Sequence, residues 1–127
     1  MSFTESKKNG LWGEIYAARY LRDHGYEIWD ANYRTRLGEV DLVAFCDDIL
    51  VFCEVKTRSP HGIGTPAEAV DRDKQRRIGL VAKQFVKELR YNGVYRFDVI
   101  EVYLSEQGDH AVNHIKQAFD GESAGLR

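Results

Sequence analysis

Two apolar runs lie close together in the chain, GEVDLVAF at residues 38–45 and LVFCEVKT at residues 50–57. Both are rich in β-branched and aromatic residues, which favour strands. Residues 46–49 separate the runs, and this spacing is typical of a β-hairpin with its turn centred on residues 47–48. Apolar residues occupy both faces of each run, so the pattern predicts two central strands of a sheet rather than edge strands.

The register of this hairpin places carboxylates opposite one another. Asp41 is expected to face Glu54, and Glu39 is expected to face Lys56. Because side chains alternate along a strand, all four should project from one face of the sheet. Opposed carboxylates repel one another and resist burial, and one lysine cannot neutralise three acids. Oxygen ligands of this kind suit a hard divalent cation, so the pattern predicts a site for Mg²⁺ or Mn²⁺.

The same acids have a second interpretation, a solvated face with ordinary cross-strand salt bridges, which is the commoner explanation of a bare D…ExK pattern. The neighbouring residues favour a cleft instead. An apolar patch on the same face is formed by Val43, Phe45, Leu50 and Phe52. A helix is therefore expected to cover that patch and to leave the acids at the rim of a cleft, where functional groups gather.

Helical periodicity is present on both sides of the hairpin. It predicts an amphipathic helix that begins at Leu11 and stops at Gly25. A second helix is predicted at residues 72–90, and the residues of its apolar face are Ile78, Val81, Ala82, Phe85 and Leu89. A Gly/Pro-rich loop is expected at residues 58–65, and TPAE at 65–68 has the composition of a helix start.

Further strands are predicted at residues 26–34 and 95–103. A turn is predicted at residues 105–109, and residues 111–119 fit either a short strand or a helix. With helices before and after the hairpin, this order of elements predicts an α/β sandwich with a central mixed sheet.

Three polar residues, Glu14, Lys74 and Gln75, fall within the apolar arcs of the two predicted helices. Each of them alone is as readily a boundary residue as a functional one. Their common direction, toward the sheet face that carries Asp41 and Glu54, favours a role at the same site.

Basic residues are concentrated in the second predicted helix and in nearby loops. They predict a surface that contacts nucleic-acid phosphates, with a solvated helix face as the equally weighted alternative. The residues expected to contact nucleic acid are Arg34, Arg36, Arg58, Lys74, Gln75, Arg76, Arg77 and Lys83.

Length and charge limit the classes of function. The 127 residues, 43% of them apolar, suffice for a single domain at residues 1–119 with a flexible tail at 120–127. A formal net charge of −2 excludes a strongly basic chromatin-type binder. Residues 98–127 carry a net charge of −4, which leaves +2 for residues 1–97, so a local basic face remains compatible with the composition.

Several other classes are excluded by motif and by compartment. In the hairpin register Cys46 and Cys53 lie about 13 Å apart, too far for a disulfide. The polar N-terminal residues do not resemble a signal peptide, and no run is long enough to cross a bilayer, so we expect a cytoplasmic protein without membrane contact. The sequence contains no phosphate-binding glycine loop, no zinc-type cysteine pair and no G-x-S-x-G.

Several short motifs together resemble the bacterial YraN family across residues 10–102. They are GE at 13–14, NYR at 32–34, GEVDLV at 38–43, FCEVKTR at 52–58, GTP at 64–66, EAV at 68–70, KQRR at 74–77 and RFDV at 96–99. That family is regarded as a predicted endonuclease group. It is similar to archaeal Holliday junction resolvases, with the PD-(D/E)xK, restriction-endonuclease-like fold.

The resemblance assigns roles to individual residues. It makes Asp41 and Glu54 metal ligands and Lys56 the catalytic lysine, and it matches Glu14 to the acid on the first helix of the resolvases. One departure from the superfamily pattern is Val40, which stands where a proline often precedes the first acid.

These expectations combine into a metal-dependent endonuclease acting on branched or structured DNA. The backbone carbonyl of Val55 would complete the ligands of Asp41 and Glu54, Glu14 would add a ligand through water or a second ion, and Glu39 would orient Lys56. Cutting a junction symmetrically needs two sites and hence a homodimer. The alternative is a non-catalytic nucleic-acid-binding or adaptor protein that retains the fold.

Overall fold

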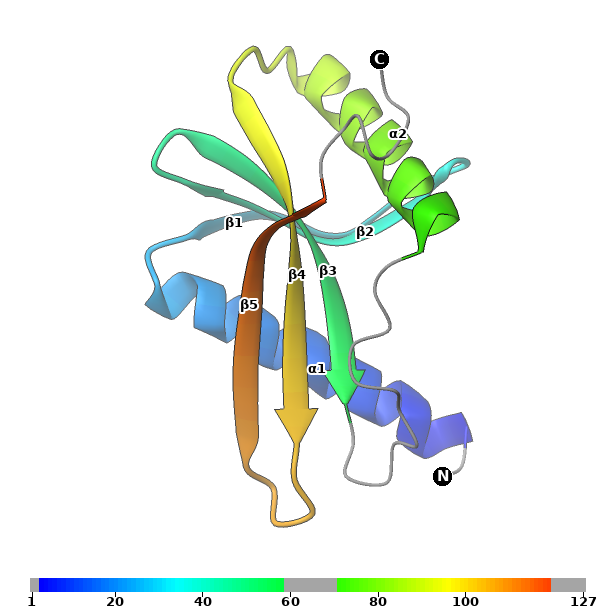
Figure 1. Cartoon of the computed structure of the whole chain (residues 1–127), viewed down its shortest axis with the longest axis vertical. Helices are drawn as coiled ribbons and strands as arrows, with labels where there is room; N and C mark the ends of the chain where they lie inside the picture. Colours follow the sequence, from blue (N-terminus) through cyan, green and yellow to red (C-terminus); the bar gives the residue numbers. More distant parts are fainter. Residues whose placement is uncertain (1–2, 59–70, 120–127) are drawn as a thin grey trace.

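Two helices and five strands make up the part of the chain that the computed structural model describes, residues 3–58 and 71–119 (Figure 1). In chain order they are α1 (Phe3–Asp23), β1 (Glu27–Thr35), β2 (Gly38–Cys46), β3 (Ile49–Arg58), α2 (Arg72–Leu89), β4 (Val94–Leu104) and β5 (His110–Phe119). The strands form one sheet in the same order, β1-β2-β3-β4-β5. Neighbouring strands are antiparallel except β3 and β4, which are parallel. This mixed sheet confirms the predicted α/β class and is consistent with a restriction-endonuclease-like fold.

The two helices cover opposite faces of the sheet (Figure 1). Ile78 and Phe85 of α2 belong to one buried cluster with Phe52, whereas Leu21 of α1 belongs to a second cluster with Val51. Successive residues of a strand point to opposite faces, so Phe52 and Val51 mark the two sides of β3. The whole apolar patch for which a covering helix was predicted, Val43, Phe45, Leu50 and Phe52, lies in the α2 cluster.

The hairpin between β2 and β3 has the predicted register. Its paired residues run from Cys46 and Ile49 at the turn to Leu42 and Cys53. Asp47 and Asp48 have φ angles of 52° and 63°, the left-handed pair that a two-residue hairpin turn of type I′ requires. Aspartate tolerates this conformation better than most residues, which explains why the turn forms without glycine.

The alternation of β2 is interrupted at Asp41. Val40 and Val43 both lie in the α2 cluster although Leu42 lies in the α1 cluster, so one residue between them does not follow the period of two. Asn32, which lies opposite Asp41 in the register of β1, has a left-handed φ of 54°. The strands therefore bend locally at this point, where the Asp41 side chain leaves the regular ladder.

The remaining elements follow the predictions with a few differences. α1 begins at Phe3, earlier than expected, and residues 110–119 form a strand, which decides between the two alternatives. Leu89 was expected on the buried face of α2, but it is 52% exposed because it lies in the last turn, directly before the left-handed cap residue Arg90. The helix start at 65–68, most of the loop at 58–65 and the tail at 120–127 lie outside the described residues.

A buried polar network ties the α1 side of the sheet together. Asp98 of β4 is fully buried and accepts hydrogen bonds from Arg96 Nε at 2.9 Å and from the backbone amide of Gln117 at 3.0 Å. His114 Nε2 of β5 lies 2.6 Å from the same carboxylate, and Arg96 also donates to the hydroxyl of Tyr26. Because every oxygen of Asp98 has a partner, this charge is compatible with the core.

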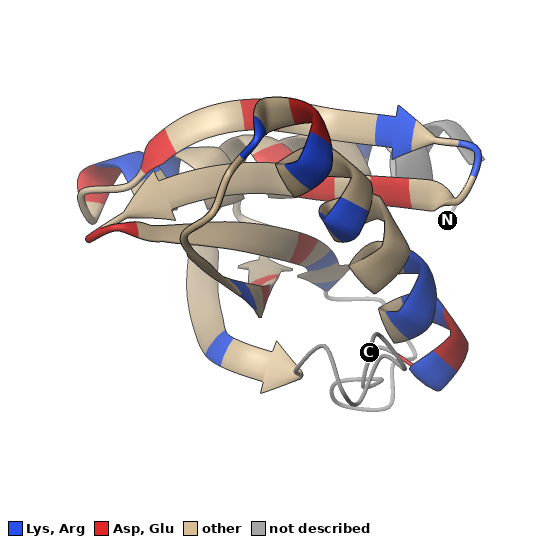
Figure 2. Cartoon of the chain, turned by 90° about the horizontal axis from the view of Figure 1, so that it is seen from above, with Lys and Arg blue, Asp and Glu red and all other residues tan. Residues whose placement is uncertain are grey.

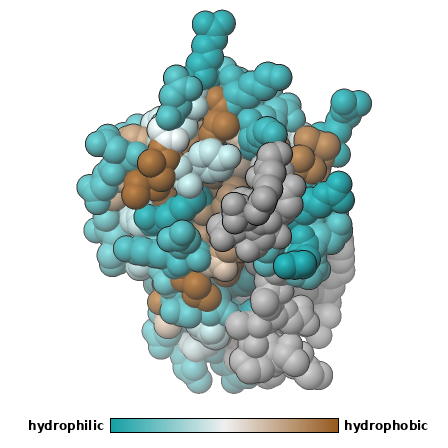
Figure 3. Space-filling view, turned by 45° about the horizontal axis from the view of Figure 1, so that its top comes forward, coloured by the Kyte–Doolittle hydropathy of each residue, from teal (hydrophilic) through white to brown (hydrophobic). Residues whose placement is uncertain are grey.

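The surface of the described residues is mixed in polarity, and the two cysteines are unpaired. Apolar residues form small patches separated by hydrophilic ones on the face shown in Figure 3. Cys46 and Cys53 are both free, as predicted. Neither helix of the described residues is long and apolar enough to cross a membrane.

Candidate active site

The candidate active site lies where β3 extends beyond the apolar cluster under α2. Leu50 and Phe52 are buried in that cluster, and the next side chains on the same face of β3 are Glu54, Lys56 and Arg58. The face of the strand thus changes from apolar to charged within a few residues. The first turn of α2 adjoins this charged part of β3, because Lys74 contacts Glu54.

Glu54 is the centre of the cluster and is only 6% exposed. The ammonium group of Lys74 forms an ion pair with Glu54 Oε1, and Lys56 Nζ lies 4.0 Å from the same oxygen. Lys74 is held there by its backbone as well, because its amide donates to the side chain of Asp71, which caps α2. Two lysines from different elements therefore converge on one carboxylate oxygen.

Asp41 lies close enough to Glu54 for the two charges to interact. Burial and the negative charge of Glu54 raise the pKa of Asp41 from 3.8 to about 7. The backbone amide of Val55 donates to Asp41 Oδ2 at 2.8 Å and opposes this rise. The electrostatic interaction between Asp41 and Glu54 agrees with their predicted proximity. The paired residues of β2 and β3 themselves end at Leu42 and Cys53, one position earlier.

Glu14 approaches the same acids from α1. A Cβ atom at Gly13 would collide with the hydroxyl of Thr57, so only glycine allows α1 to lie this close to β3. The next residue, Glu14, accepts a hydrogen bond of 3.3 Å from Asn32 Nδ2, and its charge contributes to the raised pKa of Asp41. Glu14 therefore lies near enough to Asp41 for the two charges to interact.

Glu39 is not part of this cluster, contrary to expectation. Its carboxylate binds Arg34 Nε at 2.8 Å, and its side chain is 48% exposed. The cause is the interruption at Asp41. Because Val40 faces α2, its neighbour Glu39 points to the other side of the sheet. Glu39 therefore does not orient Lys56.

Lys56 and Arg58 extend the site along β3. Burial and the nearby Lys74 lower the pKa of Lys56, while Glu54 opposes this change. Arg58 Nη2 lies 3.5 Å from Glu101 Oε2 on β4, and Glu101 is only 3% exposed. Asn113 Nδ2 of β5 donates to Glu101 Oε1 at 2.9 Å. Arg58 is thus paired with Glu101 of β4, whose other carboxylate oxygen is held by Asn113 of β5.

Three of these polar residues were missed by sequence reasoning. Asn32 belongs to the NYR motif, so the sequence marks it as a residue of interest. Nothing in the sequence shows that it contacts Glu14. Glu101 interrupts an apolar strand (VIEVY), which is a recognisable sign of a buried functional acid. Asn113 carried no signal, because its role depends on the pairing of Glu101 with Asn113 across β4 and β5.

Asp41 and Glu54 are the candidate side-chain ligands for a divalent metal ion. Within residues 3–58 and 71–119, no three His, Cys, Asp or Glu side chains are arranged to hold a metal ion. Mg²⁺ often binds proteins through one or two carboxylates and keeps several waters, so Asp41, Glu54 and the carbonyl of Val55 would suffice. Glu54 already attracts an ammonium group, and burial together with the negative charge of Glu54 raises the pKa of Asp41, so added positive charge would favour its ionised form. These residues fit a cation.

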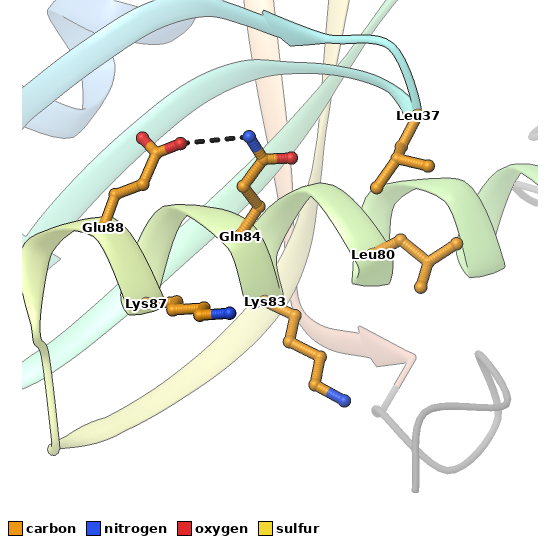
Figure 4. A pocket seen from close by; sticks show the side chains of 6 residues that line it. All are labelled: Leu37, Leu80, Lys83, Gln84, Lys87 and Glu88. Carbon is orange, nitrogen blue, oxygen red and sulfur yellow. Dashed lines mark hydrogen bonds between the residues drawn. The ribbon is translucent and has the colours of Figure 1, made fainter.

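The other residues predicted to bind nucleic acid are distributed around the site. Basic residues mark several turns of α2 (Figure 2). Arg77 pairs with Asp73 at 3.1 Å within the helix, and Gln75 is half-buried. Lys83 borders a groove of about 640 Å³ that Leu37 and Leu80 also line (Figure 4). The exposed members of the predicted set are Arg34, Arg36, Arg76, Arg77 and Lys83.

The relatives compared with this chain below bear the name of a protein family and no activity. A family model described as "Uncharacterised protein family UPF0102" matches residues 13–102. A UPF0102 protein of Alkaliphilus oremlandii is 48% identical over 117 residues, which cover 90% of this chain and 99% of that protein. For one of Rhodococcus opacus the identity is 49% over 111 residues, covering 87% and 94% of the two chains. One of Caldanaerobacter subterraneus is 40% identical over 122 residues, covering 94% and 100%.

Proposed function

The chain belongs to the uncharacterised protein family UPF0102, in agreement with its resemblance to YraN, and we propose that it is a metal-dependent endonuclease. Its substrate would be branched or structured DNA, as in the Holliday junction resolvases. The observation that carries this proposal is the interacting pair of half-buried Asp41 and buried Glu54 beside Lys56, next to the first turn of a basic helix. A carboxylate pair of this kind costs stability, which a purely structural role does not explain.

In this mechanism Asp41, Glu54 and the carbonyl of Val55 would hold Mg²⁺ or Mn²⁺, which supplies Lewis-acid polarisation of the phosphate and a lowered pKa for a bound water. Lys56 would donate a hydrogen bond to the attacking water or to the phosphoryl oxygens and so stabilise the developing negative charge. The water oxygen would form the new bond to phosphorus and lose a proton to solvent, while the bond to the leaving deoxyribose oxygen breaks and that oxygen takes up a proton from solvent. Glu14 would orient a water at the edge of the site.

The basic residues would bind the DNA backbone without reading its sequence. Arg58, held by buried Glu101, lies next along the strand from Lys56 and suits a phosphate adjacent to the cleaved one. The exposed arginines and lysines of α2 would contact phosphates of the DNA strand farther from the site. This predicts an affinity for DNA that falls as the salt concentration rises. We further propose a homodimer for symmetric cutting and a cytoplasmic location, the latter because both cysteines are free.

Cleavage assays test this proposal directly. Labelled four-way junction, flap, single-stranded and duplex DNA are incubated with the protein in Mg²⁺ or Mn²⁺, beside Asp41→Ala and Lys56→Ala. We expect cleavage of a branched substrate by the wild type and a loss of at least about 100-fold in either variant. Glu27→Gln, an exposed carboxylate at the start of β1, is the matched control and should cleave normally. Failure of the wild type on every substrate, or equal cleavage by Asp41→Ala, would refute the nuclease.

A non-catalytic nucleic-acid-binding or adaptor protein is the second candidate. The observation that favours it is the ion pair of Lys74 with Glu54, which satisfies that acid without a metal. Such a protein would bind the same junction DNA equally in EDTA and in Mg²⁺. Binding without cleavage, unchanged in Asp41→Ala, is the result that would select this candidate.

A further inference from the structure

We infer that Lys74 is a resident counter-ion of the proposed metal site, which a divalent cation displaces from Glu54 and thereby frees for a DNA phosphate. The inference rests on the proposed function, because it assumes that Glu54 is a metal ligand. It adds a coupling between metal binding and DNA binding, which the proposed set of metal ligands does not by itself imply. The protein would bind metal and DNA cooperatively, with Lys74 as the element that both affect.

The geometry distinguishes Lys74 from Lys56. Both approach Glu54 Oε1, but Lys74 forms the direct ion pair, whereas Lys56 Nζ remains 4.0 Å away. The side chain of Lys74 is 37% exposed and that of Lys56 only 23% exposed. Lys74 lies in the first turn of α2 at the edge of the site, while Lys56 lies within the sheet. Lys74 is therefore the cation that can leave toward solvent.

The charge distribution explains why a metal would displace it. Within the described residues, both lysines contact Glu54 and neither forms an ion pair with Asp41. A divalent ion that binds Asp41 and Glu54 together neutralises both acids, whereas Lys74 neutralises one. An ammonium group at contact distance from the same oxygen would then be repelled by the ion. Metal and Lys74 therefore compete for Glu54 Oε1.

The displaced ammonium group would lie in surroundings that favour a phosphate. Lys74 lies at the N-terminal end of α2, where the helix dipole favours anions. The neighbouring turn carries further bases, Arg76 and Arg77, on its exposed surface. A phosphate placed beside the metal site would therefore find a lysine there only after the metal has bound.

Titration of Mn²⁺ alone, without DNA, tests the competition. Free Mn²⁺ is followed by electron paramagnetic resonance in the full chain, in Lys74→Met and in Lys56→Met. The two variants each remove one ammonium group beside Glu54, so they are matched in charge. We expect Lys74→Met to bind Mn²⁺ about fivefold to tenfold more tightly than the wild type, and Lys56→Met at most about twofold more tightly. Lys74→Gln, which keeps a polar group at this position, should behave like Lys74→Met.

The outcomes separate this inference from the proposed function. Equal tightening in Lys74→Met and Lys56→Met would mean a general charge effect and would overturn the inference. Unchanged affinity in Lys74→Met, or no Mn²⁺ binding by any variant, would overturn it as well. The Mn²⁺ titration is independent of the DNA cleavage assay. If the titration shows the predicted competition but the protein cleaves no DNA, the nuclease proposal is refuted and the inference about Lys74 is not.

Affinity for labelled four-way junction DNA in EDTA tests the release of Lys74. Glu54→Gln removes the partner of Lys74 without adding a metal, so it should raise the affinity about threefold to tenfold. The same substitution in a Lys74→Met background should have less than half of this effect on a logarithmic scale. Equal gains in both backgrounds would show that only the lost negative charge matters, and would overturn the release step.

Discussion

Gly13 of α1 lies directly against Thr57 of β3, and a Cβ atom at position 13 would overlap the threonine hydroxyl. This contact fixes where α1 crosses the end of β3, and the following residue is Glu14. The glycine therefore sets the position of a carboxylate that interacts with Asp41. The packing of α1 on β3 and the position of Glu14 therefore both depend on the absence of a side chain at Gly13.

Replacing Gly13 by alanine should separate α1 from β3. We expect a loss of about 1–3 kcal/mol in the free energy of unfolding, because the added methyl group has no space beside Thr57. Gly10→Ala is the matched control, since nothing lies within 4 Å of a Cβ atom at that position of α1. It should stabilise the protein by about 0.5–1 kcal/mol through helix propensity. Urea unfolding of the two variants measures both effects, and equal stability would contradict the tight contact.

The hairpin was predictable because its determinants are local. The spacing of the two runs and the Asp47-Asp48 turn set the register, and the register predicted the proximity of Asp41 and Glu54. Glu39 was placed wrongly because alternation was assumed to continue through Asp41. The interruption there lies beside Asn32 of β1, whose left-handed conformation a period-two pattern does not encode.

The support around Arg58 was beyond local reasoning for a different reason. Glu101 meets Arg58 because β3 and β4 are parallel neighbours, and that pairing depends on the crossover through α2. Which strands of a parallel pair become neighbours depends on the whole chain. An acid within an apolar strand can therefore be recognised as unusual from the sequence, but the residue that it contacts cannot be predicted.

The raised pKa of Asp41 predicts a pH-dependent cost to stability. Because the folded pKa, about 7, exceeds the unfolded value of 3.8, the folded state holds the proton more tightly. The contribution of Asp41 to the free energy of unfolding is therefore most favourable below pH 3.8 and is lost as the pH rises to about 7. Asp41→Asn should be more stable than the wild type at pH 8, by about 1–3 kcal/mol, and should match it near pH 4.

Urea unfolding at both pH values in EDTA measures this difference. Glu27→Gln serves as the control, since it replaces an exposed carboxylate by an amide and should show no such pH dependence. A constant difference between Asp41→Asn and the wild type at pH 4 and pH 8 would mean that Asp41 titrates normally.

Asp98 should behave in the opposite way. Burial alone would raise its pKa, but hydrogen bonds from His114, Arg96 and the amide of Gln117 hold the pKa of Asp98 below 3.8. Its stabilising contribution is therefore present above pH 3.8 and is lost as the pH falls through the lower folded pKa. Asp98→Asn should cost about 3–5 kcal/mol at pH 7, because Arg96 loses its buried partner, and less at pH 3. Guanidinium unfolding of this variant at both pH values checks the prediction.

Metal binding should be visible as thermal stabilisation before any nuclease activity is detected. A ligand that binds only the folded state raises stability by mass action, by about 2.7 kcal/mol at a concentration of 100 times the dissociation constant. For a chain of 127 residues this corresponds to a rise of several degrees in Tm. Saturating Mn²⁺ should therefore raise the Tm of the wild type by about 8–12 °C and leave that of Glu54→Gln almost unchanged.

The comparison requires a salt control, because Mn²⁺ also screens charges. NaCl at matched ionic strength should shift the Tm of the wild type and of Glu54→Gln equally and only slightly. Asp41→Asn should lose the Mn²⁺ response as well, since the proposed ion uses both carboxylates. Lys56→Met should retain it, because the lysine is assigned to the phosphate and not to the metal. A Mn²⁺ response that survives in Glu54→Gln would locate the ion elsewhere on the protein.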